Sequence, residues 1–296
     1  MITRRQSFGI AAGLAATPML SPAFAAAAAT AAATAAAGAA ASTASAAGLA
    51  AGNATAIAGL IADPLLTHVR MRGHQDGRRC FFAYHGTFYA QVSGQRTQPM
   101  FHIEGASSAR MTRQPDGSFL YAMREAGWFC DLKTHEPQAE AMNPLTGKLV
   151  KPRHYNSAQQ SRLTKDGVIP MLEKRPPGLE YLGTIGTPTV DTDVIWTTEE
   201  LLVKMPGATP EAPGRVQTSL ATFSSNLAEL LSGPDTFVGC RLNYQTLGSF
   251  LPWMEMGSLT GVISWRLAGR KSDRVEEIPA TLRARIEREH PEVLTV

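Results

Sequence analysis

Cysteine is scarce in this chain of 296 residues, which contains only Cys80, Cys130 and Cys240. Three thiols allow at most one disulfide bridge, and no two of them form a C-x-x-C pair with the spacing of a metal site. A disulfide framework and a cysteine-bound metal are therefore not expected. We interpret the three residues as small, buried, apolar side chains.

Blocks of like charge are also absent. The formal net charge is +3, and two of the positive charges are Arg4 and Arg5 at the N-terminus. Without these two arginines, 26 basic residues stand against 25 acidic ones. A protein with no basic stretch lacks the electrostatic footprint of nucleic-acid or anionic-membrane binding, so neither partner is expected.

Several short motifs that carry chemistry are missing. The chain has no G-x-S-x-G nucleophile elbow, no H-E-x-x-H zinc motif, no C-x-x-C-H haem attachment site and no glycine-rich phosphate loop between a strand and a helix. The sequence therefore gives no reason to expect a cofactor.

The N-terminus is typical of an export signal. Residues 3–8, with Arg4 and Arg5, resemble a twin-arginine motif; a weakly apolar stretch follows, and Ala23-Phe24-Ala25 fits the small-x-small rule for cleavage. We predict a signal peptide over residues 1–25, by the twin-arginine route or by general secretion. The mature protein is then expected in the periplasm or outside the cell.

Residues 26–62 consist almost entirely of Ala, Thr, Ser and Gly. This segment has few of the Leu, Ile and Phe residues that drive membrane insertion, so we expect no stable membrane span after the signal is removed. It is interpreted as a flexible tether in front of a single β-rich domain over residues 63–296.

Short runs of aromatic and β-branched residues, separated by turn residues, indicate strands in this domain. The expected strands cover residues 79–92, 98–104, 109–113, 118–129, 193–198, 201–205, 215–223, 237–246 and 261–267. Short helices are expected at 64–72 and 225–231, and an amphipathic helix at 279–292. This pattern predicts a mainly β fold, either an up-and-down barrel or a strongly curled antiparallel sheet of about ten strands, with a C-terminal helix. A two-sheet sandwich is the alternative.

Two further expectations concern the middle of the domain. Residues 119–130, 138–142 and 148–155 are separated by the turn signals at 131–135 and 143–147, and a three-stranded meander is predicted. Residues 157–188 are rich in Pro, Gln and Gly. They are predicted to form a long loop that closes the pocket.

Polar residues gather at the ends of the predicted meander, where we expect a site. His154 is the candidate general base, with Tyr155, Asp131 and Glu125 as possible catalytic partners. The expected ligand-binding residues are Arg124, Asn156, His102, Glu104, Trp253 and Met254. His102 and Glu104 share a strand face and, with His85 or His154, suggest a metal site, but no metal-binding spacing supports one and none is predicted.

Several motifs together resemble one family. They are Arg124-Glu125-Ala-Gly127, Asp131 before a turn, Asn143-Pro144-Leu-Thr146-Gly147, His154-Tyr-Asn156, Pro252-Trp253-Met254-Glu-Met256-Gly257 and Gly269-Arg-Lys271. Over the stretch from residue 63 to the C-terminus, the chain is similar to the exported bacterial proteins catalogued as domain of unknown function 1838. The resemblance implies export and a common fold, but it implies no activity.

Two functions follow from these expectations. The first is an exported protein that binds a small, largely apolar molecule in a β-barrel pocket. The second is a cofactor-free periplasmic enzyme, an isomerase, lyase or hydrolase, that uses the same pocket. The sequence leaves the oligomeric state open.

Overall fold

Most of the chain between Cys80 and Ser272 is extended. The computed structural model describes residues 53–172, 177–207 and 214–295; the predicted signal peptide and most of the predicted tether lie outside them. The strands are β1 Cys80–Val92, β2 Gln98–Arg113, β3 Phe119–Cys130, β4 Ala141–Met142, β5 Leu149–Val150, β6 Tyr155–Thr164, β7 Gly167–Pro170, β8 Glu180–Ile185, β9 Thr189–Asp191, β10 Val194–Met205, β11 Arg215–Asn226, β12 Arg241–Gly248 and β13 Gly261–Ser272.

Helices precede, interrupt and follow this strand region. They are α2 Pro64–Arg72, α3 Leu227–Leu231 and α4 Ala280–Glu289, with the 3-10 turns η1 Pro252–Met254, η2 Val275–Glu277 and η3 Pro291–Leu294. Residues 53–62 are helical as well. In the described part of the chain, no helix has both the length and the apolar character required to cross a membrane.

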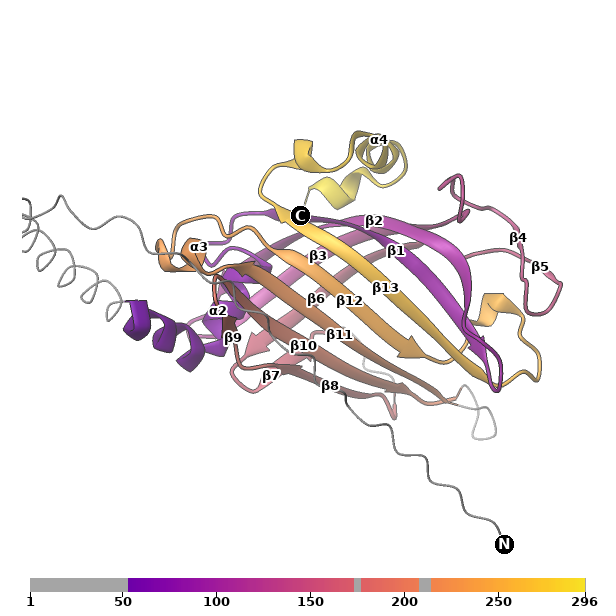
Figure 1. Ribbon diagram of the computed structural model, residues 1–296, viewed down its shortest axis with the longest axis horizontal. Coiled ribbons are helices and arrows are strands. Elements are labelled where there is room, and N and C mark those ends of the chain that lie inside the picture. Colours follow the sequence, from indigo (N-terminus) through magenta and orange to yellow (C-terminus); the bar gives the residue numbers. More distant parts are fainter. Residues whose placement is uncertain (1–52, 173–176, 208–213, 296) are drawn as a thin grey trace, which may run out of the picture. The chain divides into compact units, whose positions relative to one another are not determined.

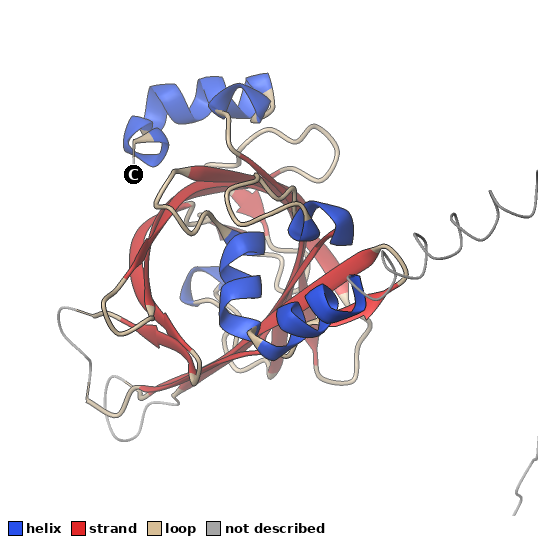
Figure 2. Ribbon diagram, turned by 90° about the vertical axis from the view of Figure 1, so that its left-hand side faces the viewer, coloured by secondary structure: helices blue, strands red, loops and turns tan. Residues whose placement is uncertain are grey.

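The strands form one antiparallel sheet of 11 strands that curls into a nearly closed barrel (Figure 2). The order is β7-β6-β3-β2-β1-β13-β12-β11-β10-β8, and β9 pairs with β10. The edge strands β7 and β8 meet through glycines: a Cβ atom on Gly167 would lie 1.9 Å from the Gly183 carbonyl oxygen. The predicted barrel or curled sheet is confirmed, and the sandwich alternative is wrong.

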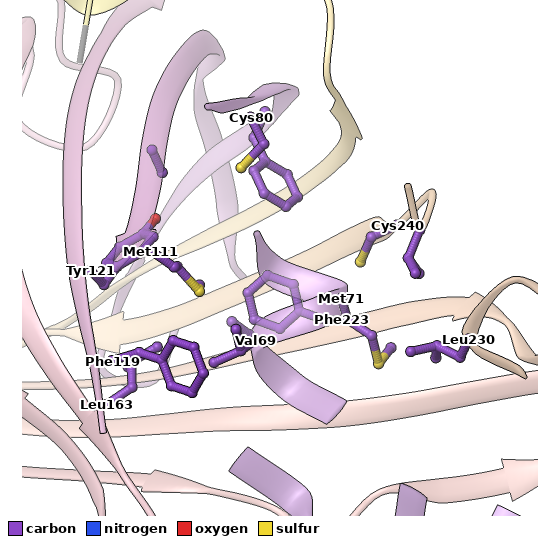
Figure 3. Packing of buried hydrophobic residues seen from close by; sticks show 14 of the residues in the cluster. Val69, Met71, Cys80, Met111, Phe119, Tyr121, Leu163, Phe223, Leu230 and Cys240 are labelled. Carbon is purple, nitrogen blue, oxygen red and sulfur yellow. The ribbon is translucent and has the colours of Figure 1, made fainter. Parts of the chain in front are cut away.

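Helix α2 plugs one end of the barrel (Figure 2). It begins at Pro64, and the side chain of Asp63 accepts a hydrogen bond from the Leu66 amide at 3.0 Å, as an N-cap does. Val69 and Met71 are fully buried among strand residues in the cluster shown in Figure 3. Burying these side chains provides the hydrophobic free energy that seats the helix in the barrel.

A buried lysine fixes the C-terminal end of α2. Lys271, on β13, donates hydrogen bonds from Nζ to the carbonyl oxygens of Arg70 at 2.9 Å, Met71 at 3.1 Å and Gly73 at 2.8 Å. The last carbonyls of a helix have no partner within the helix, and a cation at this end also interacts favourably with the helix dipole. Lys271 therefore ties the plug to the barrel wall.

The opposite end of the barrel is filled by aromatic side chains. Phe88, Phe101 and Phe129 pack against Trp253 of η1, with ring centroids 5.1–6.1 Å from the Trp253 ring. The β4–β5 hairpin lies over this end, where the buried Asn143 donates a hydrogen bond to the Met254 carbonyl at 2.7 Å. Both ends of the barrel are therefore packed, and free space is confined to the middle.

Helix α4 lies against the outer surface of the barrel (Figure 1). Its apolar face, with Leu282 and Ile286, packs on Trp128 and other outward residues of β1, β2 and β3. Trp128 also donates a hydrogen bond from Nε1 to Glu289 Oε2 at 2.9 Å. The predicted amphipathic helix is confirmed, and the wall behind it faces the cavity.

Three expectations about the chain path need correction. Residues 157–188 are not a loop, because β6, β7 and β8 lie there and form the barrel wall. The meander does not form either: β3 pairs with β6, and β4–β5 is a separate two-stranded hairpin. The two strands expected at residues 193–198 and 201–205 form the single strand β10, and Glu199 is buried within it.

The sequence did not predict β6 because the side chains that this strand points into the barrel are polar. On β6 the inward residues Ser157, Gln159 and Ser161 are polar, so the strand lacks the apolar alternation that identifies a strand in sequence. Residues 53–62, the described part of the predicted tether, are helical, and their Ile57 and Leu60 pack against the α2 cluster. The expected buried thiols are confirmed: all three cysteines are free and buried.

Candidate functional site

A cavity of about 420 Å³ lies inside the barrel between α2 and the aromatic end. Its wall comes from α2 and from strands on all sides of the barrel, from β1 to β13. Gln159 lines the cavity and is also exposed to solvent, so the cavity opens beside β6. Ligand pockets typically measure about 300–1,000 Å³, and this space falls within that range.

Tyrosines dominate the wall. The chain contains six tyrosines, and all except Tyr89 line this cavity: Tyr84, Tyr121, Tyr155, Tyr181 and Tyr244. They come from five different strands, and only closure of the barrel brings them together. Each ring offers an apolar face together with a hydroxyl group, so the wall can hold an apolar molecule and hydrogen-bond its polar groups.

Two glycines make room for the central pair of tyrosines. Gly105 pairs with Tyr84 across β1 and β2, and Gly127 pairs with Tyr155 across β3 and β6. A Cβ atom would lie 2.4 Å from the Tyr84 hydroxyl at Gly105 and 2.2 Å from the Tyr155 ring at Gly127. Any larger residue would therefore displace these rings.

Tyr84 joins Glu125 and Tyr155 in a hydrogen-bonded chain. The Tyr84 hydroxyl donates to Glu125 Oε1 at 2.8 Å and lies 2.9 Å from the Tyr155 hydroxyl. Burial raises the pKa of Glu125, and the hydrogen bond from Tyr84 only partly offsets this rise. Burial also raises the pKa of both tyrosines, with the charge of Glu125 adding to it, so their hydroxyls remain protonated.

A second polar group lies where α2 meets the cavity. Arg72 forms an ion pair with Glu199 of β10, and its guanidinium lies 4.1 Å from the centroid of the Tyr121 ring. His68 Nε2 is 3.3 Å from Glu199 Oε2, and its Nδ1 is 2.8 Å from the Thr197 hydroxyl. Burial, reinforced by the charge of Arg72, holds the pKa of His68 well below its usual range, so this histidine is neutral.

The neutral state fixes the hydrogen-bond directions around His68. A carboxylate only accepts, so Nε2–H donates to Glu199 and Nδ1 accepts from the Thr197 hydroxyl. His68 is fully buried and lies behind the cavity wall, so it positions Glu199 and has no direct access to a ligand.

The larger hollow of the molecule is less suited to chemistry. It measures about 680 Å³ and follows the outer face of β8, β10, β11, β12 and β13, where Leu182, Leu220 and Leu247 are exposed. Its two charged residues, Glu200 and Arg266, form no ion pair within the described chain. The interior cavity is therefore the candidate site.

Of the site residues predicted from the sequence, some line the cavity and others lie elsewhere. Glu125 and Tyr155 point into the cavity and belong to one hydrogen-bonded chain. Arg124, the strand neighbour of Glu125, is exposed on the outer face because successive side chains alternate. Trp253 and Met254 pack in the aromatic end of the barrel and do not line the cavity.

The remaining suggested residues lie away from the cavity. His154 accepts a hydrogen bond at Nδ1 from the Phe129 amide at 3.2 Å, and it lines neither large hollow. Asp131 accepts from the amides of Lys133 and Thr134, both at 2.8 Å, as a turn residue does. The expected convergence of His154 with Asp131 at a pocket is therefore wrong, because both side chains satisfy local backbone groups.

On the outer surface, the other three residues hold neighbouring segments. Asn156 donates to Glu292 Oε1 at 2.7 Å, and Glu104 pairs with Arg285 of α4. His102 stacks on His135 with ring centroids 3.8 Å apart. Over residues 53–172, 177–207 and 214–295, no three His, Cys, Asp or Glu residues are grouped as a metal site requires.

The comparisons with known proteins place the chain in a family without adding a function. No curated protein and no solved structure gives a significant match. One family matches residues 77–295, which covers the barrel from just before β1 to the end of η3. The chain therefore belongs to the family described as "Protein of unknown function (DUF1838)".

Proposed function

We propose that the barrel binds one small, largely apolar molecule in its interior cavity. The observation that carries this proposal is the convergence of five tyrosines on about 420 Å³ of space between two packed ends. Trp265, Phe82 and Leu267 supply further apolar surface, and the hydroxyl groups provide a few directed hydrogen bonds. An apolar lining with a few polar groups is the usual composition of a ligand pocket.

A pair of variants on β6 tests this proposal. Ser157 lines the cavity, whereas its neighbour Ala158 is exposed on the outside. The neutral fluorescent probe N-phenyl-1-naphthylamine should bind the wild-type protein with one-to-one stoichiometry. Ser157→Phe should abolish binding by filling the cavity, and Ala158→Phe should leave it unchanged. Equal binding to both variants would refute an interior site.

Acid–base catalysis is the second candidate, and the chain Glu125–Tyr84–Tyr155 favours it. Burial raises the pKa of Glu125, which makes its carboxylate a stronger base than an exposed one, and a carboxyl group can both take and give a proton. The tyrosine hydroxyls could hydrogen-bond an oxygen atom that gains negative charge. This arrangement supports an isomerase or a lyase. A hydrolase gains no support, because no cavity serine in the described chain is hydrogen-bonded to a histidine.

Deuterium exchange tests the catalytic candidate. The two-ring ketone 2-tetralone exchanges hydrogen next to its carbonyl, and NMR in D₂O follows this exchange. The wild-type protein should accelerate it, and Glu125→Gln should remove the acceleration because the amide cannot take up the proton. Glu200→Gln, a matched change on the outer face of β10, should have no effect. Equal rates with wild type and Glu125→Gln would contradict the catalytic role.

We also propose that the protein acts outside the cytoplasm. The twin arginines and the Ala23-Phe24-Ala25 site support export. A pocket for a small molecule requires no partner macromolecule, which agrees with the absence of like-charge blocks in the sequence.

A further inference from the structure

The charges on the cavity wall do not balance. In the described chain, the charged residues that line the cavity are Arg72, Glu125 and Glu199. Arg72 is paired with Glu199 and lies over the face of Tyr121. Its charge lowers the pKa of Glu125, but this effect is smaller than the rise that burial causes, and Arg72 does not pair with Glu125. Glu125 forms no ion pair with a described basic residue, and its Oε2 atom accepts no hydrogen bond there. The cavity therefore presents one carboxyl group without a cation.

Aromatic rings line the cavity that holds this carboxyl group. Tyr84 and Tyr155 contact it through the hydrogen-bonded chain, and the Tyr155 and Trp265 ring centroids are 5.6 Å apart at an interplanar angle of 53°. Tyr244 and Tyr121 line the same space. The faces of tyrosine and tryptophan rings attract cations, and aromatic cages recognise ammonium groups in this way.

An anionic ligand is disfavoured by the same arrangement. It would lie beside Glu125 without a free basic group to receive it, because breaking the buried pair between Arg72 and Glu199 would leave Glu199 uncompensated. With a neutral ligand Glu125 has no counter-charge, and burial then favours the protonated, uncharged form of its carboxyl group. A cationic ligand can instead pair with the carboxylate, which is an interaction that a neutral ligand lacks.

We propose that the ligand of the cavity is an organic cation, with an ammonium group beside Glu125 and an apolar body between the tyrosine and tryptophan rings. This inference rests on the proposed function, because it requires that the cavity binds a small molecule. It narrows that function to amines and quaternary ammonium compounds that fit a cavity of about 420 Å³.

Three naphthalene compounds of equal ring size test the charge preference. They are 2-(aminomethyl)naphthalene, a cation at pH 7, the neutral 2-(hydroxymethyl)naphthalene, and the anion 2-naphthoate, each titrated into the mature protein by calorimetry. The amine should bind at least roughly tenfold more tightly than the alcohol, because the carboxylate and the ring faces both stabilise the charge. The 2-naphthoate anion should bind most weakly of the three compounds.

Two variants assign the preference to Glu125. Glu125→Gln keeps an acceptor for the Tyr84 hydroxyl but removes the charge, so the ratio of amine to alcohol affinity should fall to within about threefold. A circular dichroism spectrum that matches the wild-type spectrum shows that the variant is folded, and the affinity ratio cancels any general change in binding. Glu200→Gln, the same change on the outer face, should keep the wild-type ratio.

The outcomes separate the two proposals. If the alcohol binds and the amine binds no more tightly, the inference is wrong and the proposed function stands. If the preference for the amine survives in Glu125→Gln, the role of this residue is refuted. If none of the three compounds binds, both the inference and the proposed function fail.

Discussion

The buried Lys271 provides a direct test of how the plug closes the cavity. Replacing it by methionine keeps an apolar side chain of similar length and removes the ammonium group. The carbonyl oxygens of Arg70, Met71 and Gly73 then lose their common donor. Because Lys271 is only 2 % exposed, water cannot readily replace that donor without a local opening of the barrel end.

The expected size of the effect follows from these three bonds. A buried acceptor left without a partner costs about 1–3 kcal/mol, so three of them set an upper limit near 9 kcal/mol. Part of this loss is offset, because the variant no longer buries an ammonium group, a cost reflected in the lowered pKa of Lys271. We expect a net loss of about 3–5 kcal/mol in the free energy of unfolding, the range seen when one partner of a buried charged interaction is removed.

Urea denaturation followed by circular dichroism measures this loss as a lower midpoint at an unchanged slope. Lys204→Met is the matched control, since the pair of Lys204 with Glu180 is largely exposed and should contribute only about 0–1 kcal/mol. A loss for Lys271→Met as small as that of the control would refute the argument. It would mean that the end of α2 finds other partners and is not held by this lysine.

Four further predictions concern pH, packing, the site and export. Burial, with the charges of Lys271 and Arg78, lowers the pKa of His74 to about 4, so between pH 6.5 and 4 the unfolded chain binds a proton that the native protein does not. The free energy of unfolding should therefore decrease as the pH is lowered through this window. Denaturation at several pH values measures this dependence, and His74→Leu should reduce its slope by up to about 1.4 kcal/mol per pH unit. An unchanged slope would show that His74 does not contribute. Asn143→Ala removes the bond to the Met254 carbonyl and that from the Leu145 amide at 2.9 Å, and should lower the unfolding free energy by about 2 kcal/mol while sparing probe binding. Gly127→Ala should weaken probe binding by about tenfold or more, as expected for a displaced Tyr155 ring, whereas Gly59→Ala, which meets no atom within 4 Å, should not. Replacing Arg4 and Arg5 by lysine should hold the precursor in the cytoplasm, and normal amounts of mature protein in the periplasm would exclude the twin-arginine route.

Local signals in the sequence determined much of the fold. Pro64 after Asp63 marks the start of α2, and the turn at residues 114–117 separates β2 from β3. Leu282 and Ile286, four residues apart, lie on one face of a helix and mark α4. These signals depend on residues close together in the chain, where backbone preferences and capping act. They were sufficient to predict an antiparallel barrel and its terminal helix.

The site depended on contacts between distant residues, and only the tertiary structure decided it. No short motif connects the five cavity tyrosines, because they come from five different strands: Tyr84, Tyr121, Tyr155, Tyr181 and Tyr244. Polar inward residues on β6 also concealed that strand, because periodicity detects only an apolar face. His154 was predicted to lie in the site because polar residues are adjacent to it in the sequence. In the structure Tyr155 points into the cavity, whereas His154 accepts a hydrogen bond from the backbone amide of Phe129. Strand alternation separates neighbours onto opposite faces of the wall, and barrel closure gathers residues from strands far apart in the chain; the cavity is the product of both.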